Sequence, residues 1–556
     1  MRHYFSVWFS LSSFVFLFPY PVYSEVISPT LPLSQTSLQL YPEILNLSLD
    51  NKRPYPIQST LVRKINLVSL SSQSSVPEIS AITPILETYE NRSLTLKDLQ
   101  TLADTLTTFY VQQGYLASRV ILVDQQVTNG EVVLCYQPGK LGDVKVEGSQ
   151  KFQKYIRSRI NAGHDRLITP DLNDQLKLLK SISLFDDFQV ALRPSDNGET
   201  TLIVTVVEAK PLQVSFGVDN YSPPSVGSER VTSNATYRNL LGIGDSVNLS
   251  YFQSLSGGLK SWDLNYSIPL NPNDGTLEFR ASRTHSRVTE GDFSAFGIVG
   301  NSSSYEVSFR QPLFRNFHGE FALSLDFSIQ NGQTFLFDNN PFPFGIGPDE
   351  SGNSRIRVLK FAQDYIRRGE YDAWALRSQF NVGMNIFDAT SNPYPIPDGQ
   401  FISWLGQVQR MQQIGNDHVL IVQADLQLTP NSLLPARQFI LGGGQSLRGY
   451  RQSARSGDNG FRLSIEDRMT LLRNQSGKSI LSLVPFLEMG AVWNHPNNPN
   501  QLRGENFLSS VGLGVIWQPN HQLQLHLDYG IPLINLSDRS QNLQDQALYF
   551  NLKYFP

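Results

Sequence analysis

The residues most able to do chemistry lie in a glycine-rich stretch late in the chain. Gly442, Gly443 and Gly444 are followed by Ser446 and Arg448. A phosphate-binding loop of the Walker type would need a lysine and a helix start directly after the glycines, and this stretch has neither. Ser446 stands in Gly444-x-Ser446-x-Arg448, which lacks the final glycine of a nucleophile elbow. The stretch therefore predicts no nucleotide site and no serine nucleophile.

Metal and thiol chemistry have equally little support. The eight histidines form no H-E-x-x-H pair, and one cysteine, Cys135, excludes the usual zinc sets and an internal disulfide. We interpret Cys135, inside a predicted strand, as a small buried residue. A net charge of -4 gives no reason to expect a nucleic-acid partner. We therefore expect a protein that is not an enzyme, with no catalytic residue, cofactor or metal site.

The first residues predict export. Arg2 and His3 precede an apolar run over residues 4–18, which is too short to span a bilayer, and Ser24 ends a short segment suited to cleavage. We expect a signal peptide over residues 1–24. A retained anchor is the alternative, and Pro19 directly after the run argues against it. Residues 25–60 are rich in proline and predict an extended tether, with a possible helix that could plug a pore.

Two similar modules are predicted next, over residues 61–138 and 139–210. In the first, Thr95 and Asp98 suit a helix start and Gly114 a helix end, and Asn129-Gly130 is a hairpin signal. The second repeats this plan with Thr169-Pro170 at a helix start, Leu184-Phe185 at the end of the helical run and a hairpin at Asn197-Gly198. The expected strands are Ser118–Val123, Glu131–Tyr136, Phe188–Leu192 and Thr201–Val207.

From residue 211 to 556 the pattern changes to strict alternation. Apolar residues at 262, 264, 266 and 268 are separated by polar ones, and residues 321–329, 523–529 and 548–554 repeat the pattern. A period of two gives each strand one apolar and one polar face. A soluble sandwich could show this too, but large aromatic residues on the apolar face and charges on the other suit a membrane barrel. Strands are expected to end at Pro269, Pro312 and Pro532.

An all-strand segment in lipid must close on itself, because each unpaired backbone group there costs several kcal/mol. The stretch is long enough for about 16 strands of about 10 residues each. The predicted fold is therefore a transmembrane β-barrel of antiparallel strands, preceded by two small α+β modules.

Several motifs together resemble the TpsB transporters of two-partner secretion, also called haemolysin secretion/activation proteins, within the superfamily of Bam- and Toc-type outer-membrane proteins. Gly114-Tyr115, Ser118-Arg119-Val120 and residues 125–130 look like the end of a first POTRA module. The opening barrel strand carries Phe216, Gly217, Asp219 and Asn220. A loop folded into the pore would carry Gly442, Gly443, Gly444, Leu447, Arg448, Gly449 and Tyr450, and the strand after it Asp458, Gly460 and Glu466.

The resemblance also implies a partner for Arg448 on the inner barrel wall. The family places an aspartate in a Phe-x-Asp-x-Gly motif, and the matching residues here are Phe486, Glu488 and Gly490. Glutamate keeps the charge and reaches farther by one methylene. Removing either partner of such a pair would cost about 3–5 kcal/mol if it is buried and about 0–1 kcal/mol if it is in open water.

The resemblance implies an outer-membrane translocator. It would bind an extended or unfolded secreted client through its POTRA modules in the periplasm, by strand addition, and export the client through the barrel. Outer-membrane lipid would be its other partner, in a bacterial envelope or the equivalent membrane of a plastid-like or cyanobacterial one. Two alternatives stay open, which are insertion of other outer-membrane barrel proteins and passive passage of solutes.

Overall fold

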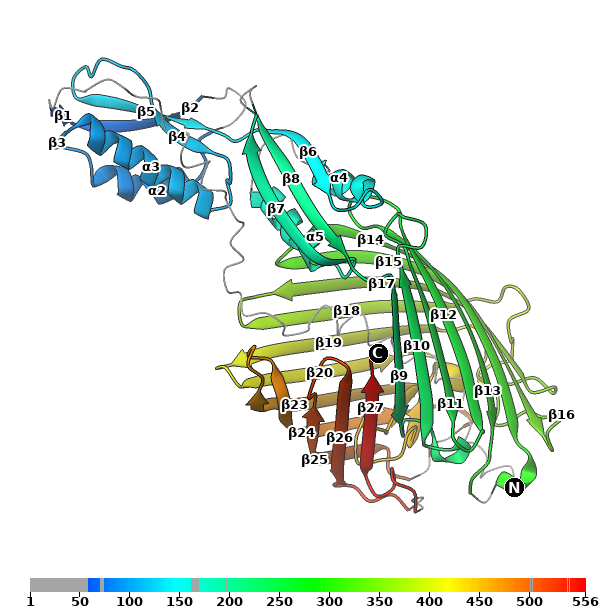
Figure 1. The fold of residues 1–556 in the computed structure, drawn as a ribbon. Coiled ribbons are helices and arrows are strands. Elements are labelled where there is room, and N and C mark those ends of the chain that lie inside the picture. The colour runs from blue at the N-terminus through cyan, green and yellow to red at the C-terminus, as the bar shows by residue number, and fades with distance from the viewer. Residues whose placement is uncertain are drawn as a thin grey trace. The chain divides into compact units, whose positions relative to one another are not determined.

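The computed structural model describes residues 59–70, 75–161, 170–195, 199–291, 293–500, 502, 504–537, 539 and 541–556. The predicted signal peptide, the tether up to residue 58 with its possible plug helix, Thr169 and Asn197-Gly198 lie outside these residues. The chain divides into two compact units, with the boundary between Lys210 and Pro211 (Figure 1). In the described part of the chain, no helix has the length and apolar character to cross a bilayer.

The unit that ends at Lys210 contains two α+β modules of the same topology. Each has a three-stranded sheet, in which the first strand runs parallel to the central one and the third runs antiparallel to it. Helices cover one face of the first sheet (Figure 1). The first module holds β1 (Thr60–Val62), β2 (Lys64–Ser69), α2 (Ile79–Glu87), β3 (Arg92–Leu94), α3 (Leu96–Gln112), β4 (Arg119–Leu122) and β5 (Glu131–Gln137). The second holds β6 (Leu141–Glu147), α4 (Gln153–Asn161), α5 (Pro170–Ser181), β7 (Phe185–Pro194) and β8 (Thr200–Glu208).

Local signals in the first module act as expected. The Thr95 side chain accepts from the Asp98 N–H, and the Asp98 carboxylate accepts from the Thr95 N–H at 2.8 Å, which forms a capping box. Gly114 follows α3 with a φ of 94°, in the left-handed region that favours glycine. Asn129 and Gly130 have φ values of 57° and 78°, as a tight hairpin turn requires. The predicted capping box, helix end and turn are confirmed.

Two details of these modules differ from expectation. The helical run in the second module ends at Ser181, so Phe185 begins β7 instead of closing α5. The strand pairs of the modules also include β2 and β6, which lie parallel to the central strands and which the sequence did not predict. A parallel partner comes from before the helices, so no hairpin signal marks it.

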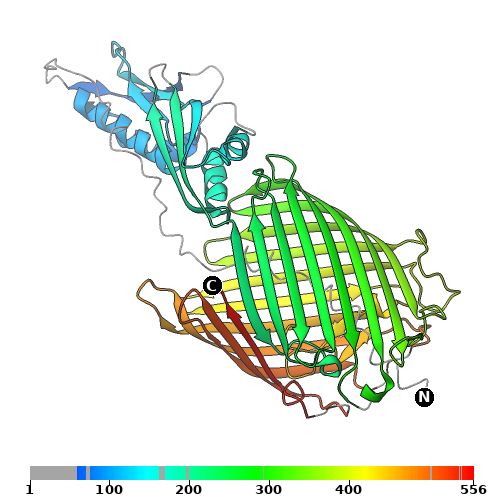
Figure 2. The same cartoon turned by 45° about the vertical axis from the view of Figure 1, so that its right-hand side comes forward.

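The second unit contains a closed antiparallel barrel of 16 strands (Figure 2). The predicted fold class is therefore confirmed. A two-residue extension, β16 (Asn340–Pro341), pairs with the end of β15. The other barrel strands are β9 (Leu212–Asp219), β10 (Arg230–Arg238), β11 (Ser246–Ser254), β12 (Leu259–Pro269), β13 (Thr276–Arg287), β14 (Val299–Asn316), β15 (Gly319–Leu336), β17 (Asn353–Arg368), β18 (Asp372–Gly383), β19 (Ile402–Ile414), β20 (His418–Leu428), β23 (Asn459–Arg473), β24 (Ser479–Trp493), β25 (Phe507–Trp517), β26 (Leu523–Pro532) and β27 (Leu548–Tyr554).

The alternation seen in the sequence separates the two faces of the barrel wall. Trp262 is 52% exposed on the outer face, whereas the intervening Asp263 pairs with Arg280 of the next strand at 2.8 Å. On β26, Leu527 is 40% exposed and Asp528 is 2% exposed. An apolar outside and a polar inside are what a barrel in lipid requires.

The predicted strand ends at proline hold in two cases out of three. β12 ends at Pro269 and β26 ends at Pro532. The third prediction is wrong, because β14 continues through Pro312 to Asn316. The register shifts between Pro312 and Phe314, so a bulge absorbs the missing N–H donor of the proline within the strand.

Candidate functional site

The long segment between β20 and β23, residues 429–458, folds back against the inner wall of the barrel. Its short strands β21 (Phe439–Leu441) and β22 (Arg455–Gly457) pair with each other. Leu447, fully buried, belongs to a cluster that joins the segment to the wall and to neighbouring loops. The cluster consists of Leu441, Leu447, Tyr450, Ala454, Val492, Leu508 and Leu536. We call residues 429–458 the in-folded loop.

The glycines shape the tip of the in-folded loop. Gly442, Gly443 and Gly449 have φ values of 105°, 102° and 98°, a region that costs other residues conformational strain. The Gly443 N–H donates to the Tyr450 carbonyl at 2.9 Å and so closes the tip on itself. The predicted glycine set therefore forms one compact turn that presents Arg448 to the wall.

Arg448 lies at the centre of three wall carboxylates and is 5% exposed. Its Nη2 donates to Glu488 at 2.7 Å and to Glu466 at 3.1 Å, and its Nη1 donates to Asp528 at 3.1 Å. The three carboxylates come from β24, β23 and β26. A permanently charged, planar guanidinium fits such a site because its donors point in several fixed directions at once.

Glu488 binds the loop through more than its charge. Oε1 accepts from Nε of Arg448 at 2.9 Å, and Oε2 accepts from the backbone N–H of Arg448 at 2.6 Å. The guanidinium also lies 3.5 Å from the centre of the Phe486 ring, at cation–π distance. The structure thus brings together Arg448, Glu488 and Phe486. The Glu488 carboxylate accepts hydrogen bonds from both the side chain and the backbone of Arg448.

Two wall glycines make room for β21. A Cβ on Gly460 would lie 2.4 Å from the Phe439 ring, and a Cβ on Gly490 would lie 2.9 Å from a Leu441 methyl. Contacts this short do not occur between real side chains, so both positions need glycine for the in-folded loop to approach the wall.

Asp458 holds the two ends of the in-folded loop together and is fully buried. Its Oδ1 accepts from the Leu433 N–H at 2.9 Å, near the start of the loop. Its Oδ2 accepts from the His495 N–H at 2.9 Å and from Asn498 Nδ2 at 2.8 Å, both in the loop after β24. The prediction that Asp458 lies in the strand after the loop is wrong, because β23 begins at Asn459. Asp458 is the last residue of the in-folded loop and stabilises the base of the loop through these hydrogen bonds.

Of the residues predicted for the first barrel strand, Phe216, Gly217 and Asp219 lie on β9, whereas Asn220 directly follows its last residue. Phe216 is 49% exposed on the outer face, while Asp219 is 2% exposed and bonds Arg230 of the neighbouring strand at 2.6 Å. A Cβ on Gly217 would lie 2.6 Å from Thr232 Oγ1, and Asn220 contacts the last strand. The structure does not bring this set into the Arg448 cluster.

The sequence missed two residues of the site, Asp528 and Tyr549. Asp528 lies on the polar face of an alternating strand, so the pattern marked it as facing the interior but could not select it among the other interior charges. The hydroxyl of Tyr549 accepts from the Gly449 N–H at 3.0 Å. The alternation predicts polar residues at interior positions, so it gave no reason to select the aromatic residue Tyr549 as part of the site.

Comparison with known protein families gives a direct match for this architecture. Residues 198–516 match the family described as haemolysin secretion/activation protein ShlB/FhaC/HecB. The chain belongs to this family. Residues 63–139 match the ShlB-type POTRA domain, which covers the first α+β module. The resemblance seen in the sequence is therefore confirmed.

Relatives of this family match over different shares of the chain. The heme/hemopexin transporter protein HuxB of Haemophilus influenzae is 21% identical over 474 residues, which cover 83% of this chain and 82% of that protein. The hemolysin transporter protein ShlB of Serratia marcescens is 26% identical over 233 residues, 38% of this chain and 37% of the relative. The solved structure of CdiB from Escherichia coli shares the fold, with a TM-score of 0.69, 18% identity and coverage of 92% of this chain and 93% of that one.

Proposed function

We propose that this protein is an outer-membrane translocator of two-partner secretion, which binds an unfolded partner protein through its POTRA modules and exports it through the barrel. The observation that carries the proposal is the family match over residues 198–516, most of which is barrel. In this proposal the POTRA modules lie in the periplasm. The partner is exported in an extended state, because a barrel of this size offers no passage for a folded domain.

The first POTRA module has an edge suited to an extended client. Within the described residues, β5 is the strand that pairs with β2, which leaves the other side of β2 as an edge. The Ile65 N–H faces this edge and donates to Glu90 Oε1 at 2.9 Å. Since backbone groups alternate in direction along a strand, the N–H of Leu67 also faces the edge. At the opposite edge of the sheet, the Val120 N–H already donates to Thr107 Oγ1.

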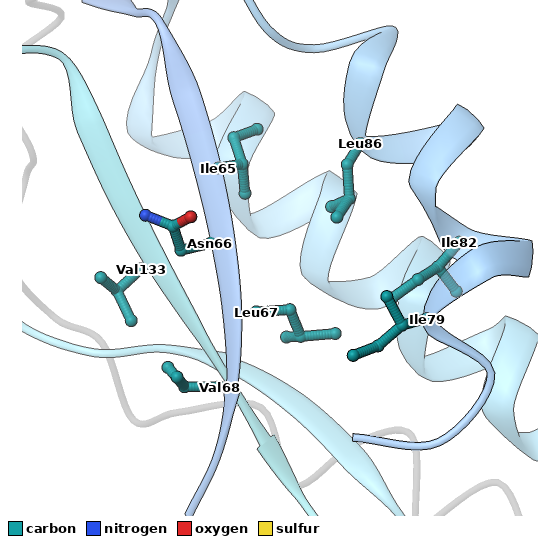
Figure 3. Close-up of a pocket in the computed structure, with 8 residues that line it drawn as sticks. All are labelled: Ile65, Asn66, Leu67, Val68, Ile79, Ile82, Leu86 and Val133. Carbon is teal, nitrogen blue, oxygen red and sulfur yellow. The ribbon is translucent and has the colours of Figure 1, made fainter. Parts of the chain in front are cut away.

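An apolar groove accompanies this edge (Figure 3). Leu67 projects from β2 toward Ile79, Ile82 and Leu86 of α2 (Figure 3). Ile79 is 55% exposed, so part of the groove wall faces solvent. An added strand would gain main-chain hydrogen bonds from β2 and would place alternate side chains in the groove, with little demand on their sequence. This combination suits a receptor for an unfolded polypeptide.

The in-folded loop would act in the barrel itself. Arg448 and its three carboxylates hold the loop against the inner wall, so an exported chain shares the lumen with it. We propose that this cluster is a lumen anchor that sets the path of the client. Insertion of other barrel proteins and passive solute flow have less support, because the matching family is one of secretion proteins and because the loop lies in the lumen.

A substitution pair at one residue tests the receptor role. Leu67→Pro removes the N–H that faces the edge, and Leu67→Ala removes the same side chain but keeps the N–H. We expect Leu67→Pro to lower the amount of partner protein released into the medium well below that of Leu67→Ala, with equal amounts of barrel in the outer membrane. Equal export by the two variants would contradict strand addition at β2.

Deletion of residues 60–137 tests the same role more coarsely. The barrel should still assemble, because its ladder closes without this module, while capture of the partner should be lost. Normal capture by the truncated protein would reject the receptor role and leave these modules as a scaffold.

A further inference from the structure

The barrel closes at a short seam between its first and last strands. The strands are in register only over Phe216–Asp219 of β9 and Asn551–Tyr554 of β27. Beyond this ladder, Asn220 uses its side chain as a substitute peptide group. Its Nδ2 donates to the Leu548 carbonyl at 2.9 Å, and its Oδ1 accepts from the Phe550 N–H at 3.0 Å. At this end of the seam, the Asn220 side chain thus adds two hydrogen bonds to the one that the Asn220 backbone N–H donates to the Phe550 carbonyl at 3.3 Å.

A buried glutamine connects the in-folded loop to this end of the seam. Gln544 is fully buried in the connection between β26 and β27. Its Nε2 donates to the carbonyls of Asn220 and Ser222, the latter at 2.7 Å. Its Oε1 accepts from the Gln452 N–H of the in-folded loop at 2.7 Å. One side chain thus joins the loop to the segment that leaves β9.

Tyr549 makes the matching connection on the β27 side. Its hydroxyl accepts from the Gly449 N–H at 3.0 Å and donates to the Tyr450 carbonyl at 2.6 Å. Gly444 lies between aromatic rings from both sides of the seam. A Cβ there would lie 2.4 Å from Tyr221, just beyond β9, and 3.1 Å from Tyr549. The loop therefore contacts β27 and the segment just beyond β9, at the place where the barrel closes.

We propose that Gln544 and Tyr549 are positioning residues that fasten the in-folded loop across the seam, so that the loop and the seam loosen together. Displacement of the loop withdraws the support of Gln544 from Asn220 and Ser222. Separation of the strands, in turn, removes the acceptors that hold Gln544 in place under the loop. Such coupling must act equally in both directions, because it is a free energy shared by the two sites. It concerns the barrel alone and holds whatever protein is exported.

Gln544→Glu in the full-length protein in detergent micelles tests this coupling by hydrogen exchange. The new carboxylate keeps an acceptor for Gln452 but loses both donors to the Asn220 and Ser222 carbonyls. We expect exchange at residues 548–554 to become roughly tenfold faster or more, together with faster exchange at residues 442–452. The matched control is Gln379→Glu, a buried glutamine of β18, which should leave exchange at the seam unchanged.

A disulfide across the seam tests the reverse direction. Val218 and Leu552 are in register, so their Cα atoms lie within disulfide range. In a Cys135→Ala background, Val218→Cys with Leu552→Cys should slow exchange of the in-folded loop when oxidised and release it when reduced. This arm needs no change at Gln544, so it still decides the question if Gln544→Glu fails to fold.

Three outcomes would overturn the proposal. Gln544→Glu could speed exchange in the in-folded loop while the seam stays unchanged. It could speed exchange equally at the seam and in β17 and β18, which would indicate general destabilisation. The oxidised seam could leave exchange in the loop unchanged.

Discussion

Replacement of Arg448 by methionine isolates the charge at the centre of the candidate site. Methionine keeps an unbranched apolar stem over Phe486 and removes the guanidinium. Glu466 would retain Arg468 at 2.8 Å, and Asp528 would retain His526 at 3.1 Å. Glu488 would keep only the backbone N–H of residue 448 and the Ser464 hydroxyl. Of the three carboxylates, Glu488 therefore loses the most.

The size of the effect follows from the burial of the pair. Arg448 and Glu488 are 5% and 3% exposed, so the value for a buried pair applies. Removal of one partner from such a pair costs about 3–5 kcal/mol. Since each 1.4 kcal/mol is a factor of ten, the ratio of docked to released loop should fall by roughly two to four orders of magnitude. The barrel ladder is untouched, so membrane insertion should persist.

A double-mutant cycle with Glu488→Gln provides the assay. Docking of the loop is measured as its rate of cleavage by an added protease in detergent, and export is measured as partner protein in the medium. We expect Arg448→Met to speed cleavage and to reduce export. The double variant should be less impaired than the sum of the two single changes, because it leaves no unpaired charge. Strict additivity, or unchanged cleavage in Arg448→Met, would refute the anchor.

Four further predictions concern other residues. Asp458→Leu removes the acceptor that joins both ends of the in-folded loop, so cleavage of the loop by protease should speed up by roughly thirtyfold or more, with the barrel still inserted; a change below threefold would contradict its role. Gly444→Ala should loosen the loop as well, because its methyl would overlap Tyr221, and unchanged protection of the loop would show that Tyr221 yields. Thr95→Ala should lower the stability of the first module by about 1 kcal/mol, measured as faster hydrogen exchange in α3, and an unchanged rate would contradict the cap. Hydrogen bonds from the Thr95 backbone and side chain lower the pKa of Asp98. The contribution of Asp98 to the stability of the first module is therefore complete above the pKa that Asp98 has in the unfolded chain, and it is lost as pH falls through its pKa in the folded protein. Hydrogen exchange in α3, corrected for its intrinsic pH dependence, should therefore become faster only at acid pH.

Local chemistry in the sequence accounts for several elements of this protein. The capping box at Thr95 and the turn at Asn129-Gly130 depend on residues within four positions of each other, so the sequence contains the whole interaction. The barrel was predictable for a different reason. Alternation over hundreds of residues fixes which face of each strand meets lipid, and lipid leaves closure as the only way to pair the backbone. Pro312 shows the limit of this reasoning, because a bulge between Pro312 and Phe314 lets β14 continue through the proline.

The candidate site was only partly predictable. The glycines and Arg448 stand close together in the sequence, and the resemblance supplied Glu488. Glu466 and Asp528 lie 18 and 80 positions from Arg448 in the sequence. Their role as further partners of Arg448 depends on the register of the strands that carry them. Many interior carboxylates share the same alternation, and a shift of register would present others.

By itself, the sequence determined that the chain forms strands with one face for lipid and one for a polar interior. It also determined that a glycine-rich turn carries the permanent charge of Arg448. These properties arise from side chains and backbone within a few residues. Only the tertiary structure decided that the in-folded loop meets Gln544 and Tyr549. Closure of the barrel brings β9 and β27 together from opposite ends of the unit, and such contacts depend on the completed ring.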